Sequence, residues 1–279
     1  MPMLAAVASA AALAAATQTI EIRFAAVVAA QPFRCGATYG GVGSPAVTVR
    51  PTDFRFYVTG LALLDRRGRR VPVELDQDGL WQYRDIALLD FEDGSGPCRG
   101  GNAGLNLVLR GRVPKGRHAG LEFQVGLPPD LNHGDAAAAP VPLNYTSMFW
   151  AWRAGYRFFK IDMDVIRAGA APADRATGFP IHIGSTGCGA GALTAPPSLP
   201  CRNPNLVAVR FERFDPARDV VQVDLAAIVA DTDPTVNAPD TAPGCMSAPE
   251  DSDCRGVFAA FGLSWREQGP GLQRVFRRN

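Results

Sequence analysis

The amino-acid sequence predicts an all-β protein, an antiparallel β-sandwich or barrel-like fold with long disulfide-stapled loops. Short segments in which apolar and polar residues alternate recur along the chain, and loops rich in glycine, proline and aspartate separate them. No segment of helical length shows a convincing amphipathic period. The 279 residues show no internal repeat and no boundary between domains, so we expect one β-sandwich domain over residues 17–279.

Residues 1–16 have the composition of a secretory signal peptide. Residues 3–16 form an apolar run too short to span a bilayer as a helix, and Ala14, Ala15 and Ala16 offer an Ala-x-Ala cleavage site. No Lys or Arg precedes this run, so a buried N-terminal helix stays open as the alternative. No later apolar run has the length of a membrane span. We therefore expect an exported protein, periplasmic or secreted.

An even number of cysteines in an exported chain predicts disulfides. The cysteines are Cys35, Cys98, Cys188, Cys201, Cys245 and Cys254. The middle pair flanks a loop rich in glycine and proline, and the last pair flanks a short acidic loop, so each pair is predicted to form a local staple. The first two cysteines are then left to bond over a long range. A zinc site is the alternative, but no Cys-x-x-Cys pair occurs and the histidines are scattered.

Taken in order, the period-2 pattern predicts strands along the whole chain. They span residues 19–28, 53–64, 71–75, 80–91, 105–113, 120–127, 156–165, 179–183, 206–211, 220–225 and 258–265. The strands at 105–113 and 120–127 are predicted to pair as a hairpin. Residues 225–230 have the length of one helical turn, and residues 168–176 read as a loop because Gly169 and Pro172 interrupt the alanines.

The stretch from residue 131 to residue 160 concentrates rare side chains. His133 lies on a loop, and Trp150 and Trp152 form a Trp-x-Trp arrangement that places both indoles on one face of a strand. His182 alternates with two isoleucines on its short strand, so it faces away from them. Two imidazoles suit copper, zinc, iron or nickel. Further ligands are open among Asp135, Asp162 and Met246, and ordinary structural roles for the histidines and tryptophans are the alternative.

Other functional classes find little support in the sequence. The net charge is +1 and no basic stripe occurs, so no nucleic acid is expected as a partner. The chain has no Gly-x-Ser-x-Gly, His-Glu-x-x-His or P-loop motif, so we do not expect an enzyme. A glycosidase-like carboxylate pair stays open. The main alternative to a metal site is an exported β-sandwich binding or adhesion module that uses exposed aromatic side chains.

Several longer motifs carry a resemblance to a known family. They are PFRCGATY, PTDFRFYVTGLALL, WQYRDIALLDFEDGSGPC, LEFQVGLPPDLNHGD, PLNYTSMFWAWRAGYRFFKID, FPIHIGSTGC and APGCMSAPEDSDC, and they extend over residues 31–263. In these motifs the chain resembles the MbnP-like proteins, also called the metallo-mystery-pair four-Cys or W-x-W family.

The resemblance implies a non-enzymatic copper-binding protein of the periplasm or outer surface of a Gram-negative bacterium. It implies a partner, a di-haem protein resembling cytochrome c peroxidases, which oxidises one tryptophan to kynurenine. The family motifs fall on His133, His182, Trp150 and Trp152, and we favour Trp150 as the modified residue in a site for one copper ion. Met246 is a weaker thioether candidate.

Overall fold

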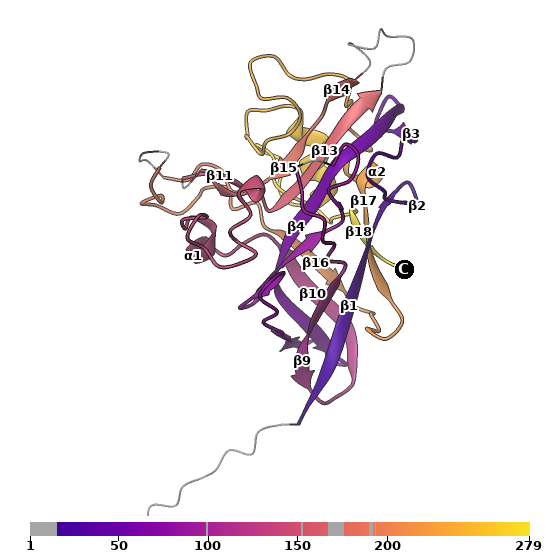
Figure 1. Ribbon diagram of the computed structural model, residues 1–279, viewed down its shortest axis with the longest axis vertical. Coiled ribbons are helices and arrows are strands. Elements are labelled where there is room, and N and C mark those ends of the chain that lie inside the picture. The colour runs from indigo at the N-terminus through magenta and orange to yellow at the C-terminus, as the bar shows by residue number, and fades with distance from the viewer. Residues whose placement is uncertain (1–15, 99, 152, 167–175, 190–191, 193) are drawn as a thin grey trace, which may run out of the picture.

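The computed structural model describes residues 16–98, 100–151, 153–166, 176–189, 192 and 194–279. Two large β-sheets face each other across one apolar core (Figure 1). Among the strand pairs of these described ranges, β1 with β17 is parallel and the others are antiparallel. The predicted all-β fold is thereby confirmed, in its sandwich form. Residues 1–15 of the predicted signal peptide and most of the predicted 168–176 loop lie outside the described residues.

The larger sheet follows the order β14-β13-β4-β10-β16, with shorter strands attached at its margins. Its strands are β3 (Tyr39–Val42), β4 (Val47–Asp65), β5 (Arg70–Pro72), β7 (Gln82–Tyr83), β8 (Ile86–Asp90), β10 (His118–Val125), β13 (Phe159–Ile166), β14 (Ala176–Gly178), β15 (Ile181–Ile183) and β16 (Val207–Phe211). The smaller sheet follows the order β18-β17-β1-β9-β6, and β2 pairs with β1. Its strands are β1 (Thr17–Val28), β2 (Gln31–Pro32), β6 (Glu74–Leu75), β9 (Val108–Pro114), β17 (Val220–Asp224) and β18 (Phe276–Arg278).

Short elements cover the sandwich. They are α1 (Pro129–Asn132), the 3-10 turn η1 (Thr146–Met148), the ribbon of β11 (Phe149–Ala151) and β12 (Gly155–Tyr156), α2 (Leu225–Ile228) and α3 (Cys254–Phe261). Figure 1 shows β11 and α1 together on one side of the long β4–β13 pair. None of the described helices is long and apolar enough to cross a membrane.

Phenylalanines from both sheets meet at the centre of the sandwich. The ring of Phe24 on β1 lies 6.2 Å from that of Phe56 on β4 and 5.7 Å from that of Phe123 on β10. The Phe276 ring on β18 lies 5.5 and 5.7 Å from the same two rings. Burying each ring contributes about 1.5–3 kcal/mol, so these contacts hold Phe54, Phe56 and Val58 of β4 inward.

The other face of β4 turns toward the covering elements. Tyr57 on this face is fully buried, donates a 3.0 Å hydrogen bond to the carbonyl of Pro142, and packs edge-on against Tyr156 of β12. Leu143 and Met148 complete this second apolar cluster. The cluster fixes the β11–β12 ribbon against β4, which matters because that ribbon carries Trp150.

Two predicted features are wrong. The strands at 105–113 and 120–127 do not pair as a hairpin, because β9 bonds to β1 and β6 in the smaller sheet while β10 bonds to β4 and β16 in the larger. Alternation shows which face of a strand is buried, but it does not name the partner strand.

The predicted strand at 258–265 is instead helix α3, which begins earlier in the chain. Its buried residues Cys254, Val257, Phe258 and Phe261 follow the helical spacing of three and four. Gly262 then ends the helix in the left-handed conformation, with φ of 69°. This helix is only eight residues long and begins on a cysteine, so its helical spacing is a weaker signal in the sequence than the apolar run that predicts a strand. The predicted helical turn after residue 225 is confirmed as α2.

The three disulfides pair as the spacing predicts, Cys35–Cys98, Cys188–Cys201 and Cys245–Cys254. The first crosses 63 residues of sequence and the other two close loops with sequence separations of 13 and 9. The disulfide-stapled loops are therefore present.

Candidate metal centre

His182 lies on β15, which pairs with β13 so that His182 stands opposite Lys160. Its neighbours Ile181 and Ile183 belong to the main core, so the imidazole occupies the opposite face of the strand, as predicted. Its Nε2 lies 2.6 Å from Oδ1 of Asp162, and its Nδ1 lies 3.2 Å from Nε of Arg157. A guanidinium only donates hydrogen bonds, so Nδ1 carries the lone pair and Nε2 carries the proton.

The charge states follow from the surroundings. Burial lowers the pKa of His182, although its hydrogen bond to Asp162 acts in the opposite direction. Burial would raise the pKa of Asp162, but hydrogen bonds and charge from His182 and Lys160 lower it to about 2. At neutral pH the ionised carboxylate of Asp162 therefore accepts a hydrogen bond from the neutral imidazole of His182. A carboxylate in this position fixes the tautomer and ring orientation of metal-binding histidines.

Trp150 is brought to the same place by β11. Its ring centroid lies 6.4 Å from that of His182, with the planes inclined by 48°. A Cβ on Gly184 would come within 2.5 Å of the indole, so only glycine leaves room for this ring position. The guanidinium carbon of Arg157 stands 5.4 Å from the indole centroid. The fold thus places together two of the side chains that the sequence singles out.

Arg157 is the residue that joins this group to the backbone. Its Nη1 donates to the carbonyls of Ser147 and Phe149 at 2.9 and 2.8 Å, while its Nε reaches His182. Sequence reasoning missed it, because an arginine two residues before a strand gives no signal of its own. Its importance comes from the fold of the ribbon back onto β15.

His133 follows α1 and is held by its neighbour. The Asn132 Oδ1 accepts the backbone N–H of Tyr156 at 2.8 Å, so the amide nitrogen must face the other way. That nitrogen donates toward Nε2 of His133 at 3.2 Å and toward Oγ of Ser185 at 3.3 Å. The lone pair of His133 is therefore on Nε2. The same Nε2 lies 3.3 Å from Sγ of Cys201.

The structure does not place the two histidines in one cluster of ligand atoms. Among the described residues, two groups bring three ligand atoms within 4.8 Å of one another. One is His133 with Cys188 and Cys201, and the other is Glu92 with Cys35 and Cys98. Among the described contacts, Asn132 links His133 to the segment after His182 through Ser185. Trp152 lies outside the described residues.

The remaining ligand candidates give no further support. Asp135 accepts the backbone N–H of Ala137 at 2.9 Å in a local turn. Met246 follows the carbonyl of Cys245 that accepts the backbone N–H of His182, so the methionine segment runs along β15.

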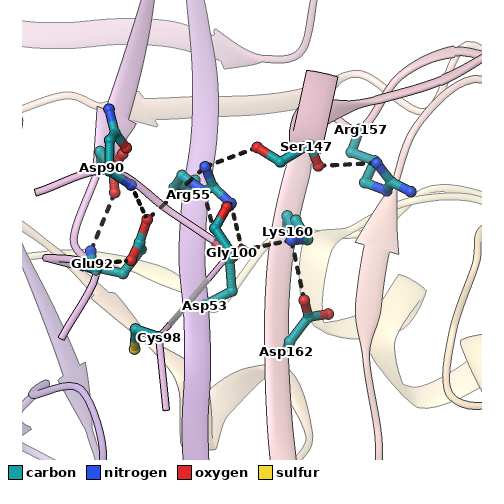
Figure 2. A network of polar contacts seen from close by, with 12 residues as sticks. Asp53, Arg55, Asp90, Glu92, Cys98, Gly100, Ser147, Arg157, Lys160 and Asp162 are labelled. Atoms are coloured by element: carbon teal, nitrogen blue, oxygen red, sulfur yellow. Dashed lines mark hydrogen bonds and ion pairs between the residues drawn. The ribbon is translucent and has the colours of Figure 1, made fainter. Parts of the chain in front are cut away.

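A buried network of charges extends from Asp162 into the larger sheet (Figure 2). Lys160 Nζ lies 3.1 Å from Asp162 and 2.5 Å from Asp53. Arg55, only 1% exposed, donates to both oxygens of Asp53 at 2.8 and 2.5 Å, and its Nη1 lies 3.9 Å from Glu92. These partners hold Asp162 in place behind His182.

The sequence signal for this network was present but not recognised. Asp53 and Arg55 are two residues apart on β4, and Lys160 and Asp162 are two residues apart on β13. The register sets Lys160 opposite Arg55, so the opposite charges meet diagonally. Four charged residues at period 2 within strands of otherwise apolar character are typical of a buried ionic network.

The comparisons with known proteins agree with this architecture. The model of the MbnP family matches residues 17–247. The solved structure of MbnP from Methylosinus trichosporium superposes with a TM-score of 0.81 at 35% sequence identity, over 94% of this chain and 98% of that one. Comparison with curated proteins gives no match. With most of its length matched by the family model and by a relative of this identity, the chain belongs to the MbnP family.

Proposed function

We propose that this chain is an exported, non-enzymatic copper-binding protein whose site is built on His182 and an oxidised Trp150, with His133 as a third candidate ligand. One observation carries the proposal, the contact of the Trp150 indole with an imidazole that a buried carboxylate orients. Membership of the MbnP family supports a metal-related role. The periplasm is the proposed location, and a disulfide-stapled β fold suits that compartment.

The donors fit copper. A neutral imidazole whose other nitrogen donates a hydrogen bond to a carboxylate is a ligand that suits copper. In His182 the available atom is Nδ1, because Nε2 is engaged with Asp162. Arg157 currently lies against Nδ1, so copper binding requires its guanidinium to move aside. Bound copper would supply a redox-active cation at this point.

An intact indole would be a poor ligand, because its nitrogen lone pair belongs to the ring and the N–H only donates. Oxidative cleavage of the C2–C3 bond of Trp150, with one oxygen atom added at each carbon from dioxygen or from two molecules of hydrogen peroxide (which leave as water), and with the formyl group then released as formate by hydrolysis, would give an aryl amine and a ketone. Both can bind a metal. We propose that the di-haem partner resembling cytochrome c peroxidases carries out this oxidation.

The test is peptide mass spectrometry across residues 149–153 together with a copper count. The protein is co-expressed with the proposed di-haem partner before it is purified. Trp150→Phe serves as the matched variant because it keeps an aromatic ring. We expect kynurenine at Trp150 and one copper ion per chain, with both lost in the variant. Kynurenine at Trp152 would transfer the role to that residue. Unmodified indoles without copper would refute the proposal.

An adhesion or glycan-binding module is less well supported. Such a function needs an aromatic face open to a ligand, whereas Arg157 lies over the Trp150 ring and Gly184 lies against its edge. Metal-independent glycan binding that disappears in Trp150→Ala would favour it over the copper proposal.

A further inference from the structure

The His133 imidazole lies beside the Cys188–Cys201 disulfide. Its neighbour Asn132 accepts a hydrogen bond from Tyr156 of the β11–β12 ribbon. The Nε2 atom of His133 is 3.3 Å from Sγ of Cys201, and the ligand atoms of His133, Cys188 and Cys201 all lie within 4.8 Å of one another. Asn132 fixes the lone pair of the imidazole on this nitrogen. The group borders a cavity of about 800 Å³ whose lining includes His133, Ser185 and Cys201. The nitrogen that accepts the Asn132 amide hydrogen bond therefore also lies beside the disulfide sulfur, and metal binding there would replace that hydrogen bond.

The Cys188–Cys201 disulfide is more accessible than the other two. Both of its cysteines are half-buried, whereas Cys35 is half-buried but bonded to the fully buried Cys98, and Cys245 and Cys254 are both fully buried. Thiol–disulfide exchange requires access for the attacking thiolate, so a soluble dithiol reaches this bond first.

The backbone keeps the two cysteines adjacent without the disulfide. Thr186 and Asn203 exchange both backbone hydrogen bonds, at 2.9 and 3.0 Å, and Arg202 N–H donates to the carbonyl of Gly187 at 3.2 Å. These bonds close the loop just outside the cysteines. Reduction therefore leaves two thiols near each other and near the imidazole, instead of releasing them into a disordered loop.

We propose that reduction of Cys188–Cys201 converts this group into a second metal site, in which two thiolates and His133 bind Cu(I). A dithiol reductant donates two electrons, the S–S bond breaks, each sulfur takes one proton, and the reductant becomes its own disulfide. Cu(I) then replaces the thiol protons, which pass to water. Thiolate and imidazole donors select a soft monovalent ion of this kind. The site goes beyond the proposed function and uses neither His182 nor Trp150.

The experiment uses the full chain under anaerobic conditions. The protein is treated briefly with dithiothreitol, the reductant is removed, and thiols are counted and mapped by alkylation and mass spectrometry. Cu(I) is then titrated against a chromophoric Cu(I) chelator. We expect two thiols, at Cys188 and Cys201, and one additional Cu(I) per chain with a sulfur-to-copper charge-transfer band. Bound Cu(I) should also protect both cysteines from alkylation, a measurement that needs no variant.

Variants separate this site from the one at His182. The double replacement Cys188→Ser with Cys201→Ser should lose the additional Cu(I), while His182→Ala should keep it. His133→Ala should also lose the additional ion, but it does not separate the two sites because His133 is a candidate ligand of the first site as well. Circular dichroism checks that each variant is folded. The proposal is overturned if the two cysteines are reduced but bind no Cu(I), if the double variant retains the additional ion, or if the buried disulfides open first. Loss of copper only in His182→Ala would support the first site and reject this one.

Discussion

The two histidines lie in regions that are built in different ways. His182 stands on a strand, and each of its ring nitrogens meets a charged partner: Asp162, which pairs with the buried Lys160 of the sheet, and Arg157, which is held by carbonyls of the covering ribbon. His133 stands on a loop beside an apolar cavity, and an amide and a disulfide sulfur are its described contacts. The strand region, comprising β4, β13 and β15, fixes positions through charge and register. The loop region, comprising α1 and residues 185–205, fixes them through a disulfide and a few hydrogen bonds.

This difference separates rigidity from adaptability. Ion pairs in the strand region are buried among core residues, so each side chain has one arrangement that satisfies its neighbours. The loop region can change its chemistry through one covalent bond without disturbing the sandwich. We therefore expect substitutions in the strand region to cost stability, and substitutions in the loop region to change ligand binding more than folding.

The largest effect is expected for Arg55→Ala. It leaves Asp53 and Glu92 buried with a cation removed between them, and breaking a buried ion pair in this way costs about 3–5 kcal/mol in the free energy of unfolding. Arg69→Ala is the matched control, because its bond to Asp65 lies at the surface and should be worth about 1 kcal/mol or less. Urea denaturation measures both. Equal losses in the two variants would contradict the claim that the ion pairs of the strand region are important for stability because they are buried.

The acidic end of the same network should give stability a pH dependence. Burial, assisted by the charges of Glu92 and Asp53 and opposed by Arg55, raises the pKa of Asp90 from its ordinary value of 3.8 to about 8. The folded state therefore holds a proton that the unfolded state has lost between pH 4 and pH 8. The contribution of Asp90 to the free energy of unfolding is therefore complete below pH 4, declines as pH rises from 4 to 8, and is lost above pH 8.

Asp90→Asn should remove this part of the slope. The variant should gain stability relative to the native chain as pH rises from 5 to 9, as measured by urea denaturation at each pH. Glu92 keeps its own contribution of the same sign, because burial also raises its pKa. An unchanged slope in Asp90→Asn would show that Asp90 is already ionised in the folded protein.

The sequence predicted the all-β class well, because alternation reports directly which face of a strand is buried. It located Trp150 and His182 through rare residue types, and it paired the cysteines through loop length. Strand partners, and with them the Asp53–Lys160 contact, depend on register between segments more than 100 residues apart. The position of His133 beside Cys201 depends on how a stapled loop returns across α1. Charged residues at period 2 mark β4 and β13 separately, but no local pattern in the chain names the partner strand or the path of the returning loop.

A smaller effect, on copper binding as well as on stability, is expected for Asp162→Asn. The amide cannot hold the Nε2 proton of His182 with a full negative charge, and loss of such an orienting carboxylate weakens metal binding about 10- to 100-fold. Asp164→Asn is the control, because Asp164 lies on the same strand and pairs with Arg50 instead. Competition with a copper chelator gives the affinities. Equal copper affinity in the two variants would remove Asp162 from the proposed site.

The smallest effect should have the opposite sign. In Arg157→Gln the cation that lies against Nδ1 of His182 and over Trp150 is removed, so copper no longer has to displace it. A desolvated contact of this kind is worth about 1–2 kcal/mol, which corresponds to binding tightened about 5- to 30-fold. Arg84→Gln removes the same charge from an exposed pair with Asp130 and should change the affinity little. Weaker binding in Arg157→Gln would mean that the arginine positions the ribbon for copper instead of competing with it, because its bonds to Ser147 and Phe149 are lost together with the charge.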